Sequence, residues 1–468
     1  MFTSMRALNF KSWRDTGDLD LRPITGFFGS NSSGKTSLLQ LLLLLKQTAA
    51  SADRRQVLNL GGDSSAQVSL GLIRDVFFNH ESNQTMSLRF QWRLSEGALT
   101  PPDPTYPGST LFSSEWMSFQ TDIALRGEQP FVKRLEYAAE DANVAMAASN
   151  TRGSRIDPEY KLDAQIGNNH DFLTRRGPGR AWPLPPPAKC YGFPDEVSAY
   201  FRNADFVSEL ELELERQFGN RLFYLGPLRT YPKRQYTWQG SRPSDVGPTG
   251  EHAVDALLAS RLRRKSNTRK LNRLGRAIRL ITMEEHVAEW LCDLALISAF
   301  KVERISQDAD IYRVRVARAQ DSTEVLLTDV GFGVSQILPV LVLLAYVESG
   351  STILLEQPEI HLHPSVQAGL ADIIVEAATV RKVQVIVESH SEHLLRRLQR
   401  RVSEQALSAD DVALYFCKNS GVSSEIAPLE LNMFGEIANW PLEFFGDPFG
   451  ETAAIVEAGL RQRGSTTL

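Results

Sequence analysis

Hydrophobic and polar positions along the chain alternate in blocks that predict strands and helices in turn. Apolar runs at 5–11 and 19–28 are typical of strands, and the second leads through a glycine-rich turn into the leucine-rich stretch 35–50, which is long enough for a helix. Further strand-like runs occupy 311–318, 323–330, 351–356 and 383–389, and helical stretches between and after them begin at Ser335, Pro364 and Glu392. Strands interleaved with helices predict an α/β fold whose parallel sheet also includes the N-terminal strand.

The middle of the chain is less regular. Two strand-like runs between 67 and 95 suit a small antiparallel sheet, whereas 97–200 is rich in Pro, Gly, Ser and Asn and is interpreted as an irregular insertion. A helix over 205–218, a strand over 221–228 and two helices within 251–296 follow. The expected domains are an N-terminal lobe (1–96), the insertion (97–204), a connecting and helical subdomain (205–300), a C-terminal lobe (301–405) and a tail domain (406–468).

Composition indicates a globular protein in a reducing compartment. The chain has 468 residues, of which 42% are hydrophobic, and no apolar run approaches the roughly 20 residues that span a bilayer. No secretory signal precedes the first strand, and three cysteines without metal-like spacing favour a cytoplasmic location without membrane contact. The formal net charge of -5 gives no overall attraction to nucleic acid.

The segment "GSNSSGKT", 29–36, fits the phosphate-binding pattern G-x-x-x-x-G-K-[ST]. Gly29 and Gly34 permit a tight loop whose N–H groups converge on phosphate oxygens, Lys35 reaches the β and γ phosphates, and the Thr36 hydroxyl faces Mg²⁺. The sequence therefore predicts an ATP site with Mg²⁺ as its metal. The other predicted nucleotide-binding residues of this segment are Asn31, Ser32, Ser33 and Ser37.

Two strand ends are predicted to complete this site. The strand "TILLE" is expected beside the phosphate loop, where Glu356 would bind Mg²⁺ through its water shell, because a hard cation needs a carboxylate partner. The next strand ends at His390, which is placed to sense the γ-phosphate.

A glycine-rich loop lies ahead of the helix predicted from Ser335. Gly331 and Gly333 precede Ser335, which is predicted to cap that helix, with Pro339 in its first turn. The positive helix end either receives a phosphate or is a capped helix without further function.

Taken together, these motifs resemble a known group of P-loop ATPases. The segments "LNFKSW…ITGFFGSNSSGKTSLL", "FYLGPLRTYPKRQY", "LTDVGFGVSQILPVL…EQPEIHLHP…ESHSEHLL" and "NWPLEFFGDPFGE" are similar to ABC/SMC-like "AAA family ATPase" proteins of bacterial defence and OLD-like systems, and most similar to the PtuA-like ATPases of Septu and retron systems. The resemblance covers the first 95 residues and 221–451. It implies an ABC/SMC-head fold, with a mixed central sheet flanked by helices, a large insertion and a helical subdomain.

The resemblance also implies roles for individual residues. The head would form a homodimer or higher oligomer around ATP, and the loop 331–336 of one copy would close on the γ-phosphate held by the other. Glu356 would stand at the Walker B acid, Gln357 at the catalytic glutamate and His390 at the switch histidine. An amide can orient a water but cannot accept its proton, so either Glu359 supplies the base or turnover is slow.

Relatives of this kind differ in what the head carries. Nothing in the sequence sustains heptads for the length of an SMC arm, and the residues after His390 lack the acidic cluster of a Toprim nuclease. The resemblance therefore implies an ATPase that regulates a separate nuclease, of HNH type, in antiphage defence. An ATP-locked scaffold or sensor with negligible turnover and a DNA-repair or recombination ATPase stay open as alternatives.

A basic segment, 261–279, contains nine Lys or Arg residues and no acid. On one or two helices it would form a positive face able to contact DNA phosphates, although an acidic protein partner or a solvated face would explain it equally well. The residues of this candidate patch are Arg261, Arg263, Arg264, Lys265, Arg269, Lys270, Arg273 and Arg276.

Overall fold

The computed structural model describes residues 1–62, 66–81, 83–104, 106, 108–149, 158–177, 183–262, 268–271, 277–306, 309–319, 322–441 and 453–458. Its main helices are α1 (Lys35–Ala50), α2 (Glu196–Tyr200), α3 (Val207–Glu215), α4 (Ala253–Ser260), α5 (Met283–Asp293), α6 (Phe332–Tyr346), α7 (Pro364–Thr379) and α8 (Glu392–Ser403). Shorter 3-10 turns occupy Ile73–Val76, Phe78–His80, Leu327–Asp329 and Ala409–Asp411, and a π turn, Arg216–Asn220, extends α3.

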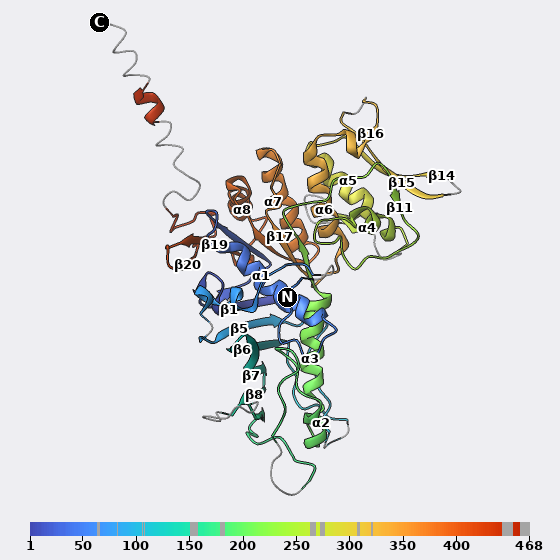
Figure 1. Ribbon diagram of the computed structural model, residues 1–468. Helices are drawn as coiled ribbons and strands as arrows, with labels where there is room; N and C mark the ends of the chain where they lie inside the picture. The colour runs from blue at the N-terminus through green and yellow to red at the C-terminus, as the bar shows by residue number, and fades with distance from the viewer. Residues whose placement is uncertain are drawn as a thin grey trace.

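A six-stranded, mostly parallel sheet forms the centre of the molecule (Figure 1). Its strands, in spatial order, are β10 (Leu222–Leu225), β17 (Thr352–Glu356), β18 (Gln384–Glu388), β4 (Ile24–Gly29), β19 (Val412–Asn419) and β20 (Ser424–Pro428). Only the edge strand β20 is antiparallel to its neighbour. The N-terminal strand β4 thus shares its sheet with C-terminal strands, as predicted, and the mixed α/β fold class is confirmed.

The two faces of this sheet belong to different hydrophobic clusters. Leu354 of β17 and Ile386 of β18 face a cluster that includes α1, whereas their neighbours Ile353 and Val385 face a cluster formed with α6, α7 and α8. Successive side chains of a strand point to opposite faces, so a continuous apolar run indicates that both faces are covered. Burial of α1 around its whole circumference explains its leucine run, because the helix lies between two sheets.

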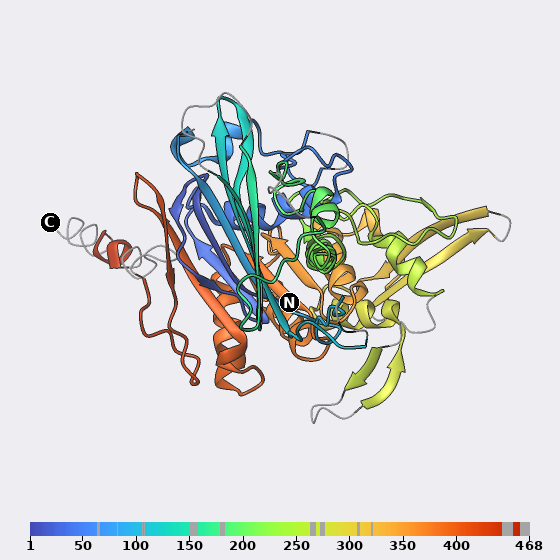
Figure 2. The same ribbon diagram turned by 90° about the horizontal axis from the view of Figure 1, so that it is seen from below.

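The second sheet is antiparallel and covers the other side of α1 (Figures 1 and 2). Its strands are β1 (Phe2–Phe10), β2 (Trp13–Asp15), β3 (Leu19–Asp20), β5 (Met86–Arg93), β6 (Trp116–Arg126), β7 (Gln129–Ala139), β8 (Ala142–Ala148) and β9 (Tyr160–Ile166). The interpretation of 97–200 as irregular was therefore wrong. The period-2 burial of Met117, Phe119, Thr121 and Ile123 carried the strand signal, which the Pro- and Gly-rich flanks obscured.

Two other strand predictions need correction. The run 19–28 is split between the two sheets, since β3 pairs with β1 and β4 enters the central sheet. Of the two runs between 67 and 95, only the second forms a strand, β5. The predicted tail domain from 406 is likewise not separate, because β19 pairs along β4 and so completes the central sheet.

Helices α4 and α5 join a third sheet on the far side of α6, formed by β11 (Tyr236–Thr237), β14 (Ala299–Ser306), β15 (Ala309–Ala317) and β16 (Val325–Leu326). Between α4 and α5, strands β12 (Thr268–Leu271) and β13 (Ala277–Ile281) pair as an antiparallel hairpin. The basic segment is therefore not helical where it is described. Among the described residues, no helix has both the length and the apolarity to cross a membrane.

Candidate nucleotide site

The phosphate loop joins the end of β4 to α1 at the carboxyl edge of the parallel sheet. Gly29 has φ 141° and Gly34 has φ 89°, conformations that favour glycine, and a Cβ on Gly29 would lie 2.0 Å from the carbonyl oxygen of Cys417. Ser33 is fully buried, whereas Asn31 and Ser32 are exposed at the tip of the loop. The Ser37 N–H donates to the Gly34 carbonyl at 3.1 Å and begins the first turn of the helix.

The Lys35 ammonium lies inside this loop. It is 3% exposed and donates to the carbonyl oxygens of Gly29 and Ser30 at 3.1 and 2.6 Å and to Ser33 Oγ at 3.3 Å. Burial lowers the Lys35 pKa, while the nearby Glu388 opposes that shift. A cation held by weak neutral acceptors is well placed to exchange them for phosphate oxygens.

Two carboxylates meet beside Thr36. Glu356 and Glu388 are register partners at the ends of adjacent strands β17 and β18, and the Thr36 hydroxyl donates to Glu388 Oε1 at 2.9 Å. The Tyr224 hydroxyl donates to Glu356 Oε2 at 2.7 Å. Burial and the charge of Glu356 raise the pKa of Glu388 to about 7. The prediction that the strand of Glu356 lies directly beside the strand of the phosphate loop was wrong. Strand β18 separates β17 from β4, so Glu356 is one strand further away.

These residues fit a magnesium ion. Glu388 Oε2 is buried and makes no hydrogen bond within 3.5 Å, although the Gln357 side chain lies near the carboxylate and lowers its pKa. A cation beside two neighbouring carboxylates would stabilise their charged forms. Among the residues that the structure describes, no group of three or more His, Cys, Asp or Glu side chains forms a metal cage. Mg²⁺ is commonly held by one or two carboxylates together with substrate phosphates and waters, and Glu356 and Glu388 could supply such carboxylates.

Gln357 directly follows β17. It adopts a left-handed conformation with φ 45°, and its N–H donates to the Glu388 carbonyl at 2.9 Å.

Glu359 and His390 lie together close to the phosphate loop. Glu359 is 6% exposed, and one of its oxygens accepts the His390 N–H at 2.7 Å. The other carboxylate oxygen, Oε2, is buried and makes no hydrogen bond within 3.5 Å. Burial raises the Glu359 pKa, and the His390 N–H and the nearby Ser389 side chain oppose that shift. Burial and the neighbouring Lys35 lower the pKa of His390, and the Gly29 carbonyl opposes the shift, so the imidazole lies beside the loop as predicted.

The glycine loop before α6 differs from its prediction. Helix α6 begins at Phe332 with Gly331 as its N-cap, so Ser335 lies inside the helix and donates to the Phe332 carbonyl at 2.7 Å instead of capping. Pro339 is consequently beyond the first turn. Gly333 faces His361 and Leu362, and among the described residues no hydrogen bond or ion pair joins 331–336 to the phosphate loop of the same chain.

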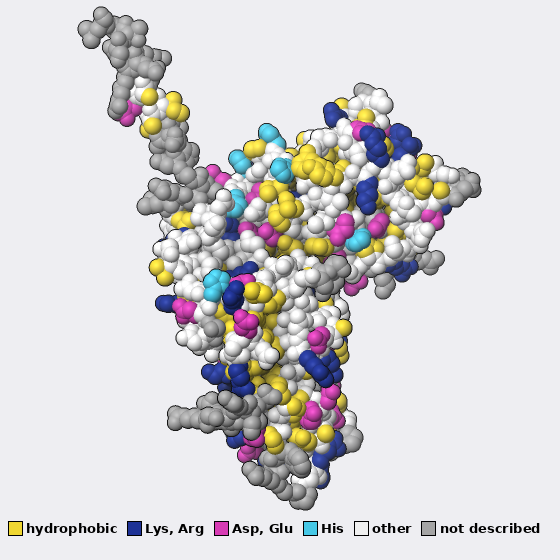
Figure 3. Space-filling model, in the orientation of Figure 1, with side chains coloured by type: hydrophobic (Ala, Val, Ile, Leu, Met, Phe, Trp, Pro, Cys, Tyr) yellow, Lys and Arg dark blue, Asp and Glu magenta, His cyan; other side chains and the backbone are white. Residues whose placement is uncertain are grey.

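Of the candidate residues in the basic segment, the structure describes the side chain of Arg261 alone. Arg261 donates to Glu284 Oε2 at 2.6 Å and to the Val302 carbonyl at 2.6 Å, which makes it a structural residue. Arg269 and Lys270 belong to β12, but their side chains lie outside the described part of the chain, as do Arg263, Arg264, Lys265, Arg273 and Arg276. On the face drawn in Figure 3, Lys and Arg side chains occur in several separate groups with acids nearby.

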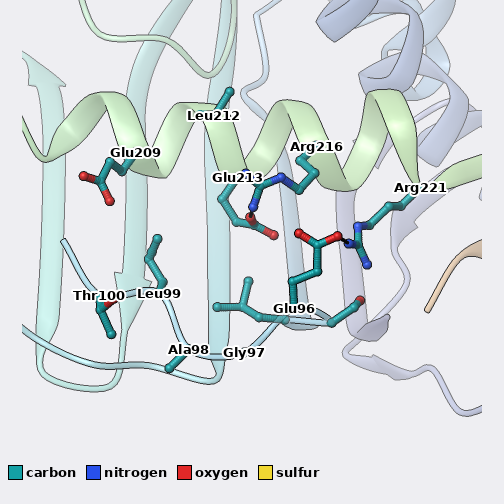
Figure 4. A pocket seen from close by; sticks show the side chains of 12 residues that line it. Glu96, Gly97, Ala98, Leu99, Thr100, Glu209, Leu212, Glu213, Arg216 and Arg221 are labelled. Carbon is teal, nitrogen blue, oxygen red and sulfur yellow. Dashed lines mark hydrogen bonds and ion pairs between the residues drawn. The ribbon is translucent and has the colours of Figure 1, made fainter. Parts of the chain in front are cut away.

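A separate cavity of about 410 Å³ lies between α3 and the segment 94–100 (Figure 4). Its two arginines are already paired: Arg216 with Glu213 at 2.8 Å, and Arg221 with Glu96. The cavity is near the amino ends of β10 and β17, at the opposite sheet edge from the phosphate loop. Both cations of this cavity are therefore already paired with acids, and the cavity lies away from the nucleotide site.

Sequence reasoning missed Glu388 and Tyr224. Both have a signal in hindsight, because Glu388 is the last residue of the strand that leads to His390, and Tyr224 is the one polar group in the apolar run Leu222–Leu225.

Comparisons with known proteins include a match to an ATPase-domain family. Residues 251–395 match a family model described as an AAA ATPase domain, and residues 407–455 match one described as "Protein of unknown function (DUF3696)". No curated protein matches the chain.

Several solved structures are similar to the chain at low identity. An SMC head bound to the C-winged helix domain of ScpA has 10% identity and a TM-score of 0.46, covering 92% of this chain and 98% of its own. The SMC head domain from Thermotoga maritima has 10% identity and a TM-score of 0.37, and the match covers 92% of this chain and 99% of that one. A third structure is an Smc head domain with an extended coiled coil bound to the C-terminal domain of ScpA, derived from Pyrococcus furiosus. It has 10% identity and a TM-score of 0.42, and the match covers 98% of this chain and 99% of that one. Because these TM-scores are below 0.5, the P-loop ATPase fold rests on the strand order, the phosphate loop and the ATPase-domain match.

Proposed function

We propose that this protein binds Mg-ATP and hydrolyses it slowly. The observation that carries the proposal is the position of Lys35, whose buried ammonium fills the phosphate loop beside Thr36 and Glu388. The match of 251–395 to an AAA ATPase domain supports the same class of activity.

Each residue of the site has a task in this proposal. The backbone N–H groups of 29–36 and Lys35 would bind the phosphates, and Thr36, Glu356 and Glu388 would hold the ion or its waters. A bound Mg²⁺ neutralises charge on the phosphates during transfer. His390, which lies near Lys35 and Gly29, would donate to the terminal phosphate.

Hydrolysis also needs a base that accepts the proton of the attacking water, and Gln357 cannot serve as one. Gln357 can orient a water, and Glu359 has an unpartnered carboxylate oxygen and a raised pKa that suits a proton acceptor. We therefore assign the base to Glu359, two residues further along the chain than Gln357, the residue that the resemblance implies. A scaffold that only holds ATP is the alternative, and it predicts no phosphate release from the purified protein.

Replacement of Lys35 by Ala tests the proposal. We expect ATP affinity to fall at least about 100-fold, because the loop loses its only buried ammonium among the described residues of 29–37, worth about 3 kcal/mol in charged hydrogen bonds. Lys301→Ala, whose side chain is 61% exposed in the third sheet, is the matched control and should bind as wild type does. Unchanged ATP binding by the Lys35 variant would refute the assignment of the loop.

We also propose that ATP joins two copies of the chain. Gly331 and Phe332 are exposed, and their loop makes no hydrogen bond to the phosphate loop of its own chain among the described residues, which supports closure on a second copy. Light scattering with and without Mg-ATP tests this: a doubled mass only with ATP is expected, and a monomer at saturating ATP would contradict it.

A role in antiphage defence, through regulation of a separate HNH-type nuclease, rests on the family resemblance. It predicts that such a nuclease copurifies with the chain and that Lys35→Ala removes protection from phage while leaving the complex intact. DNA-stimulated ATP turnover without any nuclease partner would favour a repair or recombination role instead.

A further inference from the structure

Arg229 is a buried cation without a partner at the same sheet edge as the phosphate loop. It follows β10, whose carboxyl end lies beside that of β17. Its neighbours Leu228 and Tyr231 are 78% and 73% exposed, whereas Arg229 is only 6% exposed. All three guanidinium nitrogens are buried, and none has a hydrogen-bond partner. The side chain therefore points inward, opposite to those around it, without a protein group to bind.

The surroundings of Arg229 are those of the nucleotide site. Burial lowers the Arg229 pKa to about 10, while Glu359 and Tyr224 oppose that shift, so the side chain is a cation at neutral pH. The Tyr224 hydroxyl donates a hydrogen bond to Glu356, and the charge of Glu359 also raises the pKa of Lys35 in the phosphate loop. Arg229 and Glu359 are close enough to interact electrostatically, yet no ion pair within 4.0 Å joins them, and Glu359 Oε2 is unpartnered as well.

A buried charge is retained in proteins when something pairs with it, because desolvation is otherwise uncompensated. A guanidinium presents several donors in a planar fork that matches phosphate oxygens, and it binds them more strongly than a neutral donor does. Phosphate is also the anion that the neighbouring loop is built to hold.

We propose that Arg229 binds the terminal phosphate of a nucleotide held in the phosphate loop of the same chain. This inference rests on the proposed ATP binding. It makes Arg229 one of the residues, with His390, by which the site distinguishes ATP from ADP, since a terminal phosphate is present only in ATP. It also gives Glu359 a neighbour that would orient its free oxygen toward the attacking water.

The test compares ATP with ADP. Dissociation constants for Mg-ATP and Mg-ADP are measured on the full chain for wild type, Arg229→Met and the exposed control Arg304→Met. The wild type and the control should prefer ATP, and Arg229→Met should lower that preference about tenfold to a hundredfold with ADP affinity unchanged. Because Arg229 is unpaired in the free protein, its replacement by Met should not lower the melting temperature without nucleotide.

Several outcomes would overturn the inference. A wild type without ATP preference would do so, as would an Arg229→Met variant that keeps the preference. A lower melting temperature with the preference retained would identify Arg229 as a structural neutraliser of Glu359. If Arg229→Met fails to fold, Arg229→Lys keeps the charge without the fork, and an unchanged preference in that variant would equally overturn the inference. If Lys35→Ala loses all nucleotide binding while Arg229→Met keeps the wild-type preference for ATP, only this inference is refuted. If Lys35→Ala still binds nucleotide, the proposed function is refuted.

Discussion

Replacement of Glu359 by Gln separates the two residues that compete for the role of base. Gln has the size of Glu and keeps an oxygen to accept the His390 N–H, which Glu359 binds at 2.7 Å. The change removes only the second oxygen, Oε2, as a proton acceptor, and that oxygen makes no hydrogen bond within 3.5 Å, although the Ser389 side chain lies near the carboxylate. The geometry around His390 should therefore survive the substitution.

The size of the effect follows from the role. A positioned general base contributes about 10²- to 10⁴-fold to a rate, which corresponds to about 3 to 5 kcal/mol in the activation free energy. We expect that loss in the hydrolysis step, with ATP affinity changed less than about twofold because no phosphate-binding group is altered. Burial raises the Glu359 pKa, so the wild-type rate should rise with pH through that pKa and then level off. The Gln variant should lack this rise.

Single-turnover phosphate release at saturating Mg-ATP measures the hydrolysis step apart from binding and product release. Glu392→Gln is a suitable control, because Glu392 is a partly exposed carboxylate at the start of α8 whose ion-pair partner, Arg396, is on the same helix. The reasoning fails if Glu359→Gln hydrolyses ATP at the wild-type rate. That result would leave Gln357 as a residue that orients water without a base, and Gln357→Glu should then accelerate turnover.

Two further predictions concern stability. Burial raises the pKa of Glu211 on α3 from 4.5 to about 7. Between these pH values the folded chain binds a proton that the unfolded chain does not, so the contribution of Glu211 to the free energy of unfolding falls by about 3 kcal/mol as the pH rises. Glu211→Gln should therefore raise the free energy of unfolding at pH 8 but not at pH 4.5, as measured by urea denaturation; an equal effect at both pH values would contradict the assigned cause. The Gln384 side chain joins the two large sheets, since it accepts the Phe2 N–H at 2.9 Å and donates to the Phe2 carbonyl at 2.7 Å. Gln384→Leu should lower the free energy of unfolding by about 2 to 4 kcal/mol because both backbone groups stay buried without partners, and a loss below about 0.5 kcal/mol would show that water replaces the amide.

The phosphate loop and the helix after it could be predicted from sequence because both depend on local conformation. Only glycine readily adopts the backbone at Gly29 and Gly34, and the 16-residue stretch of α1, with its leucine run and no Gly or Pro, is typical of a buried helix. Glu356 and His390 were found in the same way, at the ends of apolar strands. The wrong predictions arose where composition outweighed periodicity, as in β6–β9, or where a local cap pattern was assigned one turn too late, as at Ser335.

The sequence by itself determined the phosphate loop, its lysine and the acids that follow apolar strands, because each is specified by residues close together in the chain. Only the tertiary structure decided which of those acids meet. Strand β18 lies between β17 and β4 through pairing across more than 350 positions, and that order brings Glu388 to Thr36 and sets Glu356 one strand further away. The inward position of Arg229 has the same origin, since the burial of a side chain depends on the sheets and loops that close around it and not on its neighbours in sequence.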